Sequence, residues 1–274
     1  MFILEKRPSP SRAWTIATPL LAVALTMIAG GVMFALLGKN PFEAIRTIFW
    51  DPLFNEAVAS YSRPQLLVKA APLILIAVGL SLGFRAGIWN IGAEGQYIMG
   101  AIFGAAAGLA LYPMENRAVV FPLMVLAGAF GGFLWAMIPA ILKTRFRTNE
   151  ILVSLLLVYV AQALLASMAL GALRNPEGGG FPGSRNLGQW PAAANAELIP
   201  NTGLHWGVIA AIVAVIAAEF LLRRHILGFN IRLTGSAPRA ARFAGVNPQR
   251  LVVLCMGISG ALAGLAGLFE VAGP

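Results

Sequence analysis

The chain has 274 residues, of which 58% are hydrophobic and 11% are charged. Soluble domains carry about 25% charged residues, so this chain has too few polar side chains for a water-soluble or a disordered protein. The net charge is +9. Because the basic residues stand in short runs between apolar stretches, they indicate membrane topology rather than nucleic-acid binding.

Seven long apolar stretches, separated by charged, Pro-rich or Gly-rich segments, indicate membrane-spanning helices. Backbone groups in lipid must be paired within the protein, and the stretches lack the strict alternation of β-barrel strands. We therefore expect an all-α, polytopic membrane helix bundle that forms a single transmembrane domain over residues 1–274. The stretches lie at about 14–37, 66–83, 96–111, 119–142, 151–171, 204–222 and 251–272.

The distribution of basic residues predicts a cytoplasmic amino terminus. Threading the seven stretches alternately through the membrane then places 13 of the 20 basic residues inside: Lys6, Arg7, Arg12, Arg85, Lys143, Arg145, Arg147, Arg223, Arg224, Arg232, Arg239, Arg242 and Arg250. The loop 172–203 lies outside in this threading. Its length and its Gly, Pro and Asn content fit an external contact surface or a short surface helix, and equally a mobile connector.

The Gly-rich segment 83–96 joins the second and third stretches without an ordinary polar loop. The third stretch has only 16 residues, about 24 Å of helix against a bilayer core of about 30 Å, so part of this segment should lie at membrane depth. Its glycines permit the turns that this needs. The segment is either a hinge or lining of a translocation path, or a packed re-entrant turn with Glu94 as a buried cap. The candidate residues are Asn90, Gly92, Glu94, Gly95 and Gln96.

A second unusual segment, about 223–250, predicts a short cytoplasmic helix. Ser236 would cap it, Pro238 would stand in its first turn, and Gly245 would end it. Its alanines form a small-residue face, flanked by arginines, that another protein could approach. The alternative is a basic loop that binds no protein and only sets the topology or touches anionic lipid. The candidate contact residues are Ser236, Ala237, Pro238, Arg239, Ala240, Ala241, Arg242, Phe243, Ala244 and Gly245.

Other motifs, present and absent, limit the functions that the chain could have. Glycines at helical spacing, such as 100, 104 and 108, indicate close helix packing. Glu219 stands four residues before Arg223 and should pair with it. The chain has no G-x-x-x-x-G-K-[ST] loop and no hydrolase motif, so we expect no catalytic residue, no bound metal and no cofactor on it.

Four ordered motifs resemble the permeases of bacterial ABC importers for simple sugars and nucleosides. They are residues 90–96, 149–151, 240–246 and 259–267. The resemblance implies a type II importer-like permease in the inner membrane, and a separate ATPase that uses ATP and docks on the segment 236–245. It also implies a second, homologous or identical permease subunit and an extracytoplasmic substrate-binding protein. Members of this class run on for further helices, so we expect the chain to be a fragment of a longer permease.

The resulting hypothesis is a non-catalytic transport subunit that forms part of the path for a simple sugar or nucleoside. Nucleosides are the weaker assignment, because residues 155–161 lack the Asn usual in nucleoside-type members. The alternatives are a permease of the related branched-chain amino acid ABC importers, a secondary transporter, and a membrane scaffold or receptor. A secondary transporter should carry ionisable groups at the helix centres, and apart from Glu94 these are missing.

Overall fold

The computed structural model describes residues 11–273 and divides the chain into two compact units, with the division after Arg63. Each unit is described by itself. Lys6 and Arg7, which the threading placed inside, lie outside the described residues. The described part is helical without β-strands, apart from one isolated bridge between Glu197 and His205. The all-α prediction is confirmed, and the single permease domain over 1–274 stays a prediction.

The first unit contains one long helix, α1 (Arg12–Leu36), followed by short helical turns. These are α2 (Pro41–Ile45), the π-helical turn η1 (Arg46–Trp50) and α3 (Asp51–Phe54). The Asn40 side chain caps α2 by accepting a hydrogen bond from the backbone N–H of Phe42, 3.1 Å away. Asn40 therefore sets where the chain turns after the first apolar stretch.

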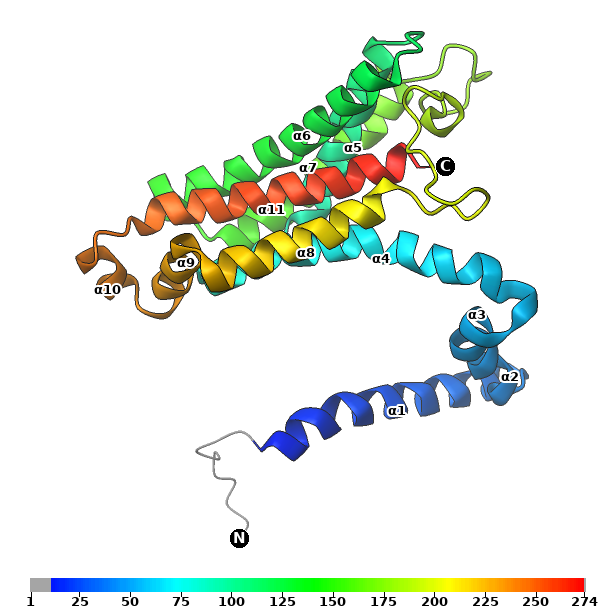
Figure 1. Ribbon diagram of the computed structural model, residues 1–274, viewed down its shortest axis with the longest axis horizontal. Helices are drawn as coiled ribbons and strands as arrows, with labels where there is room; N and C mark the ends of the chain where they lie inside the picture. The colour runs from blue at the N-terminus through cyan, green and yellow to red at the C-terminus, as the bar shows by residue number, and fades with distance from the viewer. Residues whose placement is uncertain (1–10, 274) are drawn as a thin grey trace. The chain divides into compact units, whose positions relative to one another are not determined.

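The second unit is a helix bundle whose central member is the last helix, α11, which packs along α5 and α6 (Figure 1). The helix α4 begins before the division and continues into this unit. In chain order the elements are α4 (Glu56–Arg85), α5 (Ala93–Ala110), α6 (Arg117–Phe146), α7 (Glu150–Leu170), η2 (Leu187–Gln189), α8 (Trp206–Arg224), α9 (Ile226–Ser236), α10 (Pro238–Phe243) and α11 (Pro248–Val271).

Each of the seven predicted apolar stretches corresponds to one helix. Within residues 11–273, six helices are long and apolar enough to cross a membrane, namely α1, α4, α6, α7, α8 and α11. The helix α5, which corresponds to the third stretch, has 18 residues and includes Glu94 and Gln96 in its first turn. The chain is therefore a polytopic membrane protein.

Glycines hold the three central helices close together. A side chain on Gly100 of α5 would collide with the backbone of Gly264 in α11, and one on Gly132 of α6 would collide with the backbone of Gly260. Such direct backbone contact is possible only where both helices carry small residues. The predicted packing role of these glycines is confirmed.

The basic segments gather at one end of the second unit. There the Gln249 side chain donates to the backbone carbonyl of Thr144, and Gly235 lies directly against the backbone of Arg85. At the opposite end the segment 172–203 follows α7, and Asn195 N–H donates to the carbonyl of Ala272 at 2.6 Å (Figure 1). The threading likewise groups the basic segments on one side of the membrane and places the segment 172–203 on the other side.

Candidate functional site

The segment between α4 and α5 folds back into the bundle as a re-entrant turn. Gly87 adopts the left-handed conformation (φ +73°) just after α4 ends. The Asn90 side-chain amide then donates to the hydroxyl of Ser259, 3.2 Å away. Ser259 lies 11 residues into α11, about 17 Å from the start of that helix. Irregular backbone therefore lies well inside the length of the bundle, where Ile88, Asn90 and Gly92 are buried while Trp89 and Ile91 are exposed.

Asn90 and Gln96 are buried and bind each other. The Gln96 amide donates to Oδ1 of Asn90 at 3.0 Å, and the Asn90 amide donates to Oε1 of Gln96 at 2.9 Å. The same Asn90 Oδ1 accepts the backbone N–H of Gly92. These bonds satisfy polar groups that would otherwise be costly inside the bundle. Both residues position the turn and the start of α5.

Gly92 and Gly95 serve close packing against α7, not unusual backbone angles. The φ of Gly92 is −92°, which any residue can adopt. A Cβ on Gly92 would lie 2.5 Å from the carbonyl oxygen of Ser154, and one on Gly95 would lie 3.2 Å from the carbonyl oxygen of Leu157, both in α7. The explanation through special turns is wrong for Gly92 and Gly95, and it applies to Gly87.

Glu94 lies in the first turn of α5, where the helix dipole favours its charge. Its side chain is exposed and accepts a hydrogen bond from the Gln162 amide of α7 at 3.0 Å. No side chain caps α5, since its cap position is Gly92. The interpretation of Glu94 as a buried cap is therefore wrong, because the carboxylate points away from the packed turn and towards α7.

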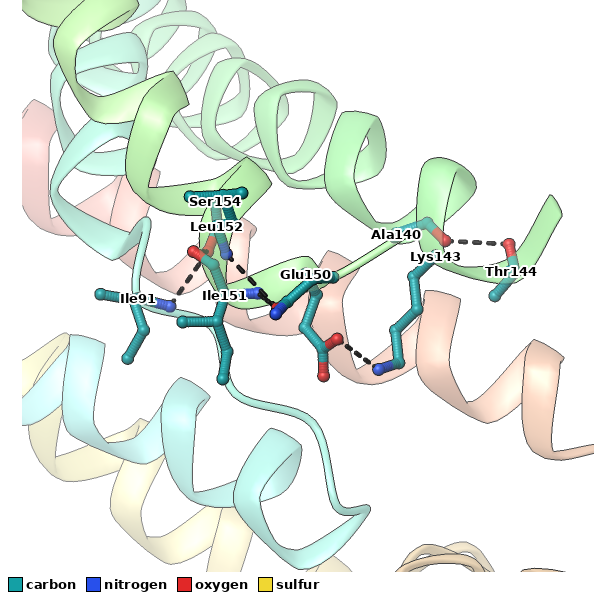
Figure 2. A network of polar contacts seen from close by, with 9 residues as sticks. Ile91, Ala140, Lys143, Thr144, Glu150, Ile151, Leu152 and Ser154 are labelled. Atoms are coloured by element: carbon teal, nitrogen blue, oxygen red, sulfur yellow. Dashed lines mark hydrogen bonds and ion pairs between the residues drawn. The ribbon is translucent and has the colours of Figure 1, made fainter. Parts of the chain in front are cut away.

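A buried ion pair closes the connection between α6 and α7. Figure 2 shows the Lys143 ammonium pointing at the Glu150 carboxylate, with 2.5 Å between the charged atoms and Glu150 only 8% exposed. One turn further along α7, the hydroxyl of Ser154 accepts the backbone N–H of Ile91 at 3.2 Å. The α6–α7 connection and the re-entrant turn are thus tied together through the start of α7.

Sequence reasoning missed the role of Lys143 and Glu150. Lys143 counted only as a topology charge, and Glu150 only as part of a motif. The available signal was Asn149, which caps α7 by accepting from the N–H of Ile151 at 3.0 Å. A capped helix start with an acid in its first turn, next to a basic run, points to such a pair. The predicted pair of Glu219 and Arg223 is confirmed, with 2.6 Å between its charged atoms.

The predicted short helix exists as α10, but Ser236 does not cap it, and the cytoplasmic location of the helix stays a prediction. Ser236 is the last residue of α9, where its hydroxyl donates to the carbonyl of Arg232 at 2.9 Å. The cap position is Ala237, whose side chain offers no acceptor. Pro238 opens the helix as expected, and Gly245 (φ +77°) follows its end.

The small-residue face of α10 is divided between the interior and the surface. Ala241 is 0% exposed because it packs inside its own chain, whereas Ala240 and Ala244 are exposed. Phe243 is 94% exposed, and Arg242 is also at the surface. The part of the segment that another protein could touch is therefore narrower than the sequence indicates.

At the other end, the segment 172–203 closes over the bundle with Leu187, Ala192 and Ala193 buried. His205 caps α8: its Nδ1 accepts the N–H of Gly207 at 3.1 Å and also contacts the Asn195 amide. Burial lowers the pKa of His205, which keeps Nδ1 free to accept at neutral pH. The alternative of a mobile connector does not describe this packed part.

The same segment carries an ion pair at its surface. Arg185 donates two hydrogen bonds of 3.0 Å to the Glu177 carboxylate, and its guanidinium lies 4.5 Å from the ring centre of Tyr112. The hydrogen bonds and charge of Arg185 lower the pKa of Glu177. Charge and aromatic contacts hold this part of the segment against the loop after α5.

The comparison with protein families identifies the chain. Residues 63–274 match the family described as "Branched-chain amino acid transport system / permease component". The chain belongs to this permease family. It is a non-enzymatic, multi-pass transport subunit of an ABC system in the inner membrane. No solved structure gives a significant match.

Curated relatives place the chain within the family. The glucose ABC transporter permease of Haloferax volcanii is 34% identical over 95% of this chain and 69% of the relative. The guanosine ABC transporter permease of Bacillus subtilis is 28% identical over 93% and 71%. The nucleoside ABC transporter permease of Lactococcus lactis is 28% identical over 92% and 70%. The chain is a permease of the class to which sugar and nucleoside permeases belong, and the amino acid and secondary-transporter alternatives are not favoured.

Proposed function

We propose that this chain carries a simple sugar or a nucleoside across the plasma membrane as part of an ABC importer. The similarity to the glucose permease over 95% of the chain is the observation that carries the proposal. A second, homologous or identical permease subunit completes the path. An extracytoplasmic binding protein delivers the solute. ATP is bound and hydrolysed by a separate ATPase, since this chain lacks a phosphate-binding loop.

Reconstitution tests this function directly. The permease, co-purified with its partner ATPase and binding protein, is placed in proteoliposomes that contain ATP. Uptake of radiolabelled glucose, ribose, uridine and guanosine is then measured, with leucine as the amino acid control. ATP-dependent uptake of a sugar or nucleoside supports the proposal, and uptake of leucine alone contradicts it.

We expect the ATPase to dock on the exposed part of the segment Ser236 to Gly245. Ala240→Trp should weaken ATPase binding in a pull-down at least tenfold, about 1.4 kcal/mol, because a bulky ring prevents close approach. Ala240 is exposed, so the change leaves the permease's own packing intact. Arg239→Glu should weaken binding in a salt-dependent way. Ala172→Trp, the same change in the exposed loop at the opposite end, is the control. If Ala240→Trp binds the ATPase as tightly as the wild type does, the prediction that the ATPase docks here is wrong.

The proposed orientation has a cytoplasmic amino terminus and the segment 172–203 outside. In a Cys255→Ser background, Phe181→Cys should react with an impermeant thiol reagent in intact cells. Phe243→Cys should react only after permeabilisation, because the two side chains lie at opposite ends of the bundle and both are strongly exposed. The reversed labelling pattern would invert the orientation.

A further inference from the structure

The bond between Glu94 and Gln162 lies in the middle part of α7, a helix that is long and apolar enough to cross a membrane. Gln162 stands 12 residues after Glu150 and 8 before Leu170 in α7, so it is about 18 Å and about 12 Å from the two ends of that helix. Glu94 reaches it at 3.0 Å from the start of α5. Both side chains are exposed on the surface of this chain.

An exposed carboxylate at this depth does not face lipid. Ionisable side chains inside membranes line water-filled paths or meet other polar groups, because hydrocarbon solvates charge poorly. Only Oε1 of Glu94 is engaged by Gln162, and among residues 11–273 its second oxygen, Oε2, accepts no hydrogen bond. The same residues hold no group of three metal-ligating side chains. The pair is therefore incomplete and still has hydrogen-bonding capacity.

An aromatic side chain stands beside this pair. Tyr159 is 62% exposed and lies three residues before Gln162, which puts both on one face of α7. A carboxylate accepts from hydroxyl groups, a carboxamide both donates and accepts, and a ring packs against carbon-bound hydrogens. Together these three groups match an uncharged solute that carries several hydroxyl groups.

We propose that Glu94, Gln162 and Tyr159 form a transient binding site on the translocation path for the hydroxyl groups of the solute. The inference rests on the proposed importer function, and it adds the residues and the chemical feature that they recognise. Vicinal hydroxyl groups are common to hexoses and to the ribose of nucleosides, so one site serves both. The carboxylate accepts hydrogen bonds from the hydroxyl groups, and the three side chains are exposed so that the solute can leave.

Water access to the site is tested without any partner protein. Purified permease with Glu94→Cys, Gln162→Cys or Tyr159→Cys, each in a Cys255→Ser background, is reconstituted in liposomes and treated with a charged thiol reagent. All three positions should react. Ile216→Cys, equally exposed at 63% but in the middle of the apolar α8, should not. If the three site cysteines stay as unreactive as Ile216→Cys, the site faces lipid or protein and the proposal is overturned.

Solute recognition is tested in the reconstituted importer with glucose and uridine as probes. Glu94→Gln keeps the size of the side chain but removes the charge, and should lower uptake of the transported probe about five- to tenfold. Uptake of 2′,3′-dideoxyuridine, which lacks the vicinal hydroxyls, should be insensitive to the change. Glu270→Gln, which alters the ion pair with Lys69 at the bundle's end, is the matched control and should retain uptake.

The outcomes separate the site from the function. If the wild-type permease transports none of glucose, ribose, uridine and guanosine, the proposed function fails, and thiol labelling still tests whether water reaches the site. If transport is normal and Glu94→Gln is unaffected, the site is overturned and the importer function stands. Loss of uptake accompanied by dissociation of the two permease subunits on size-exclusion chromatography would assign Glu94 to a subunit interface, and would also overturn the site.

Discussion

Gly92→Ala should sharply lower the yield of folded permease. A Cβ at this position would lie 2.5 Å from the carbonyl oxygen of Ser154 and 2.8 Å from its Cβ, closer than atoms in folded proteins approach. The nearest obstacle is backbone, so the start of α5 and α7 must move apart. Overpacking of this kind costs about 1–3 kcal/mol, and more where the neighbours are rigid. Folded yield and the apparent Tm in detergent measure the effect.

The displacement should also reach function, because Gly92 is two residues from Glu94. Moving α5 away from α7 lengthens the 3.0 Å bond between Glu94 and Gln162. Surviving Gly92→Ala protein should therefore show reduced uptake. Gly30→Ala is the control: Gly30 lies inside α1 with nothing within 4 Å of a Cβ, and alanine favours helix there. Equal yield and Tm for the two variants would mean that the re-entrant turn is not packed against α7.

Hydropathy predicts every long helix because a segment that crosses lipid must be apolar along its whole length. The depth of the re-entrant turn also follows from the sequence, since a third stretch of 16 residues is too short to span alone. These features depend on composition and length over many residues. They do not depend on which side chains meet in space.

The side-chain contacts could not be predicted in the same way. Ser236 is a good cap by type, but α9 continues to this residue because Ile231 and Thr234 are buried on its inner face. The exposure of Glu94 depends on which face of α5 meets α7, and apolar periodicity is weak where a helix is surrounded by both protein and lipid. Tertiary packing decides both cases.

Breaking the ion pair between Lys143 and Glu150 should destabilise the end of the bundle at which α6 and α7 are joined. Glu150 is 8% exposed and its partner's side chain is 28% exposed, so Glu150→Ala leaves an ammonium group largely removed from water without its counter-charge. Loss of one partner of a fully buried pair costs about 3–5 kcal/mol. Because water still reaches Lys143, we expect about 1–3 kcal/mol, seen as a lower apparent Tm.

A double-mutant cycle separates the pair from other effects at this position. Lys143→Met removes the charge but keeps the chain length, and Glu150→Leu with Lys143→Met replaces the pair by apolar contact. If the cost of Glu150→Leu is mainly an unpaired charge, the double variant should be more stable than Glu150→Leu alone, with a coupling of at least about 0.5 kcal/mol. Exact additivity would contradict the ion pair. The exposed pair of Glu219 and Arg223 serves as the comparison, because solvent should reduce its coupling to a few tenths of a kcal/mol.

Ser154 connects the start of α7 to the re-entrant turn. It begins the next turn of α7 and holds the N–H of Ile91, so loosening the helix start should raise hydrogen exchange at Ile91 before the rest of α7 responds.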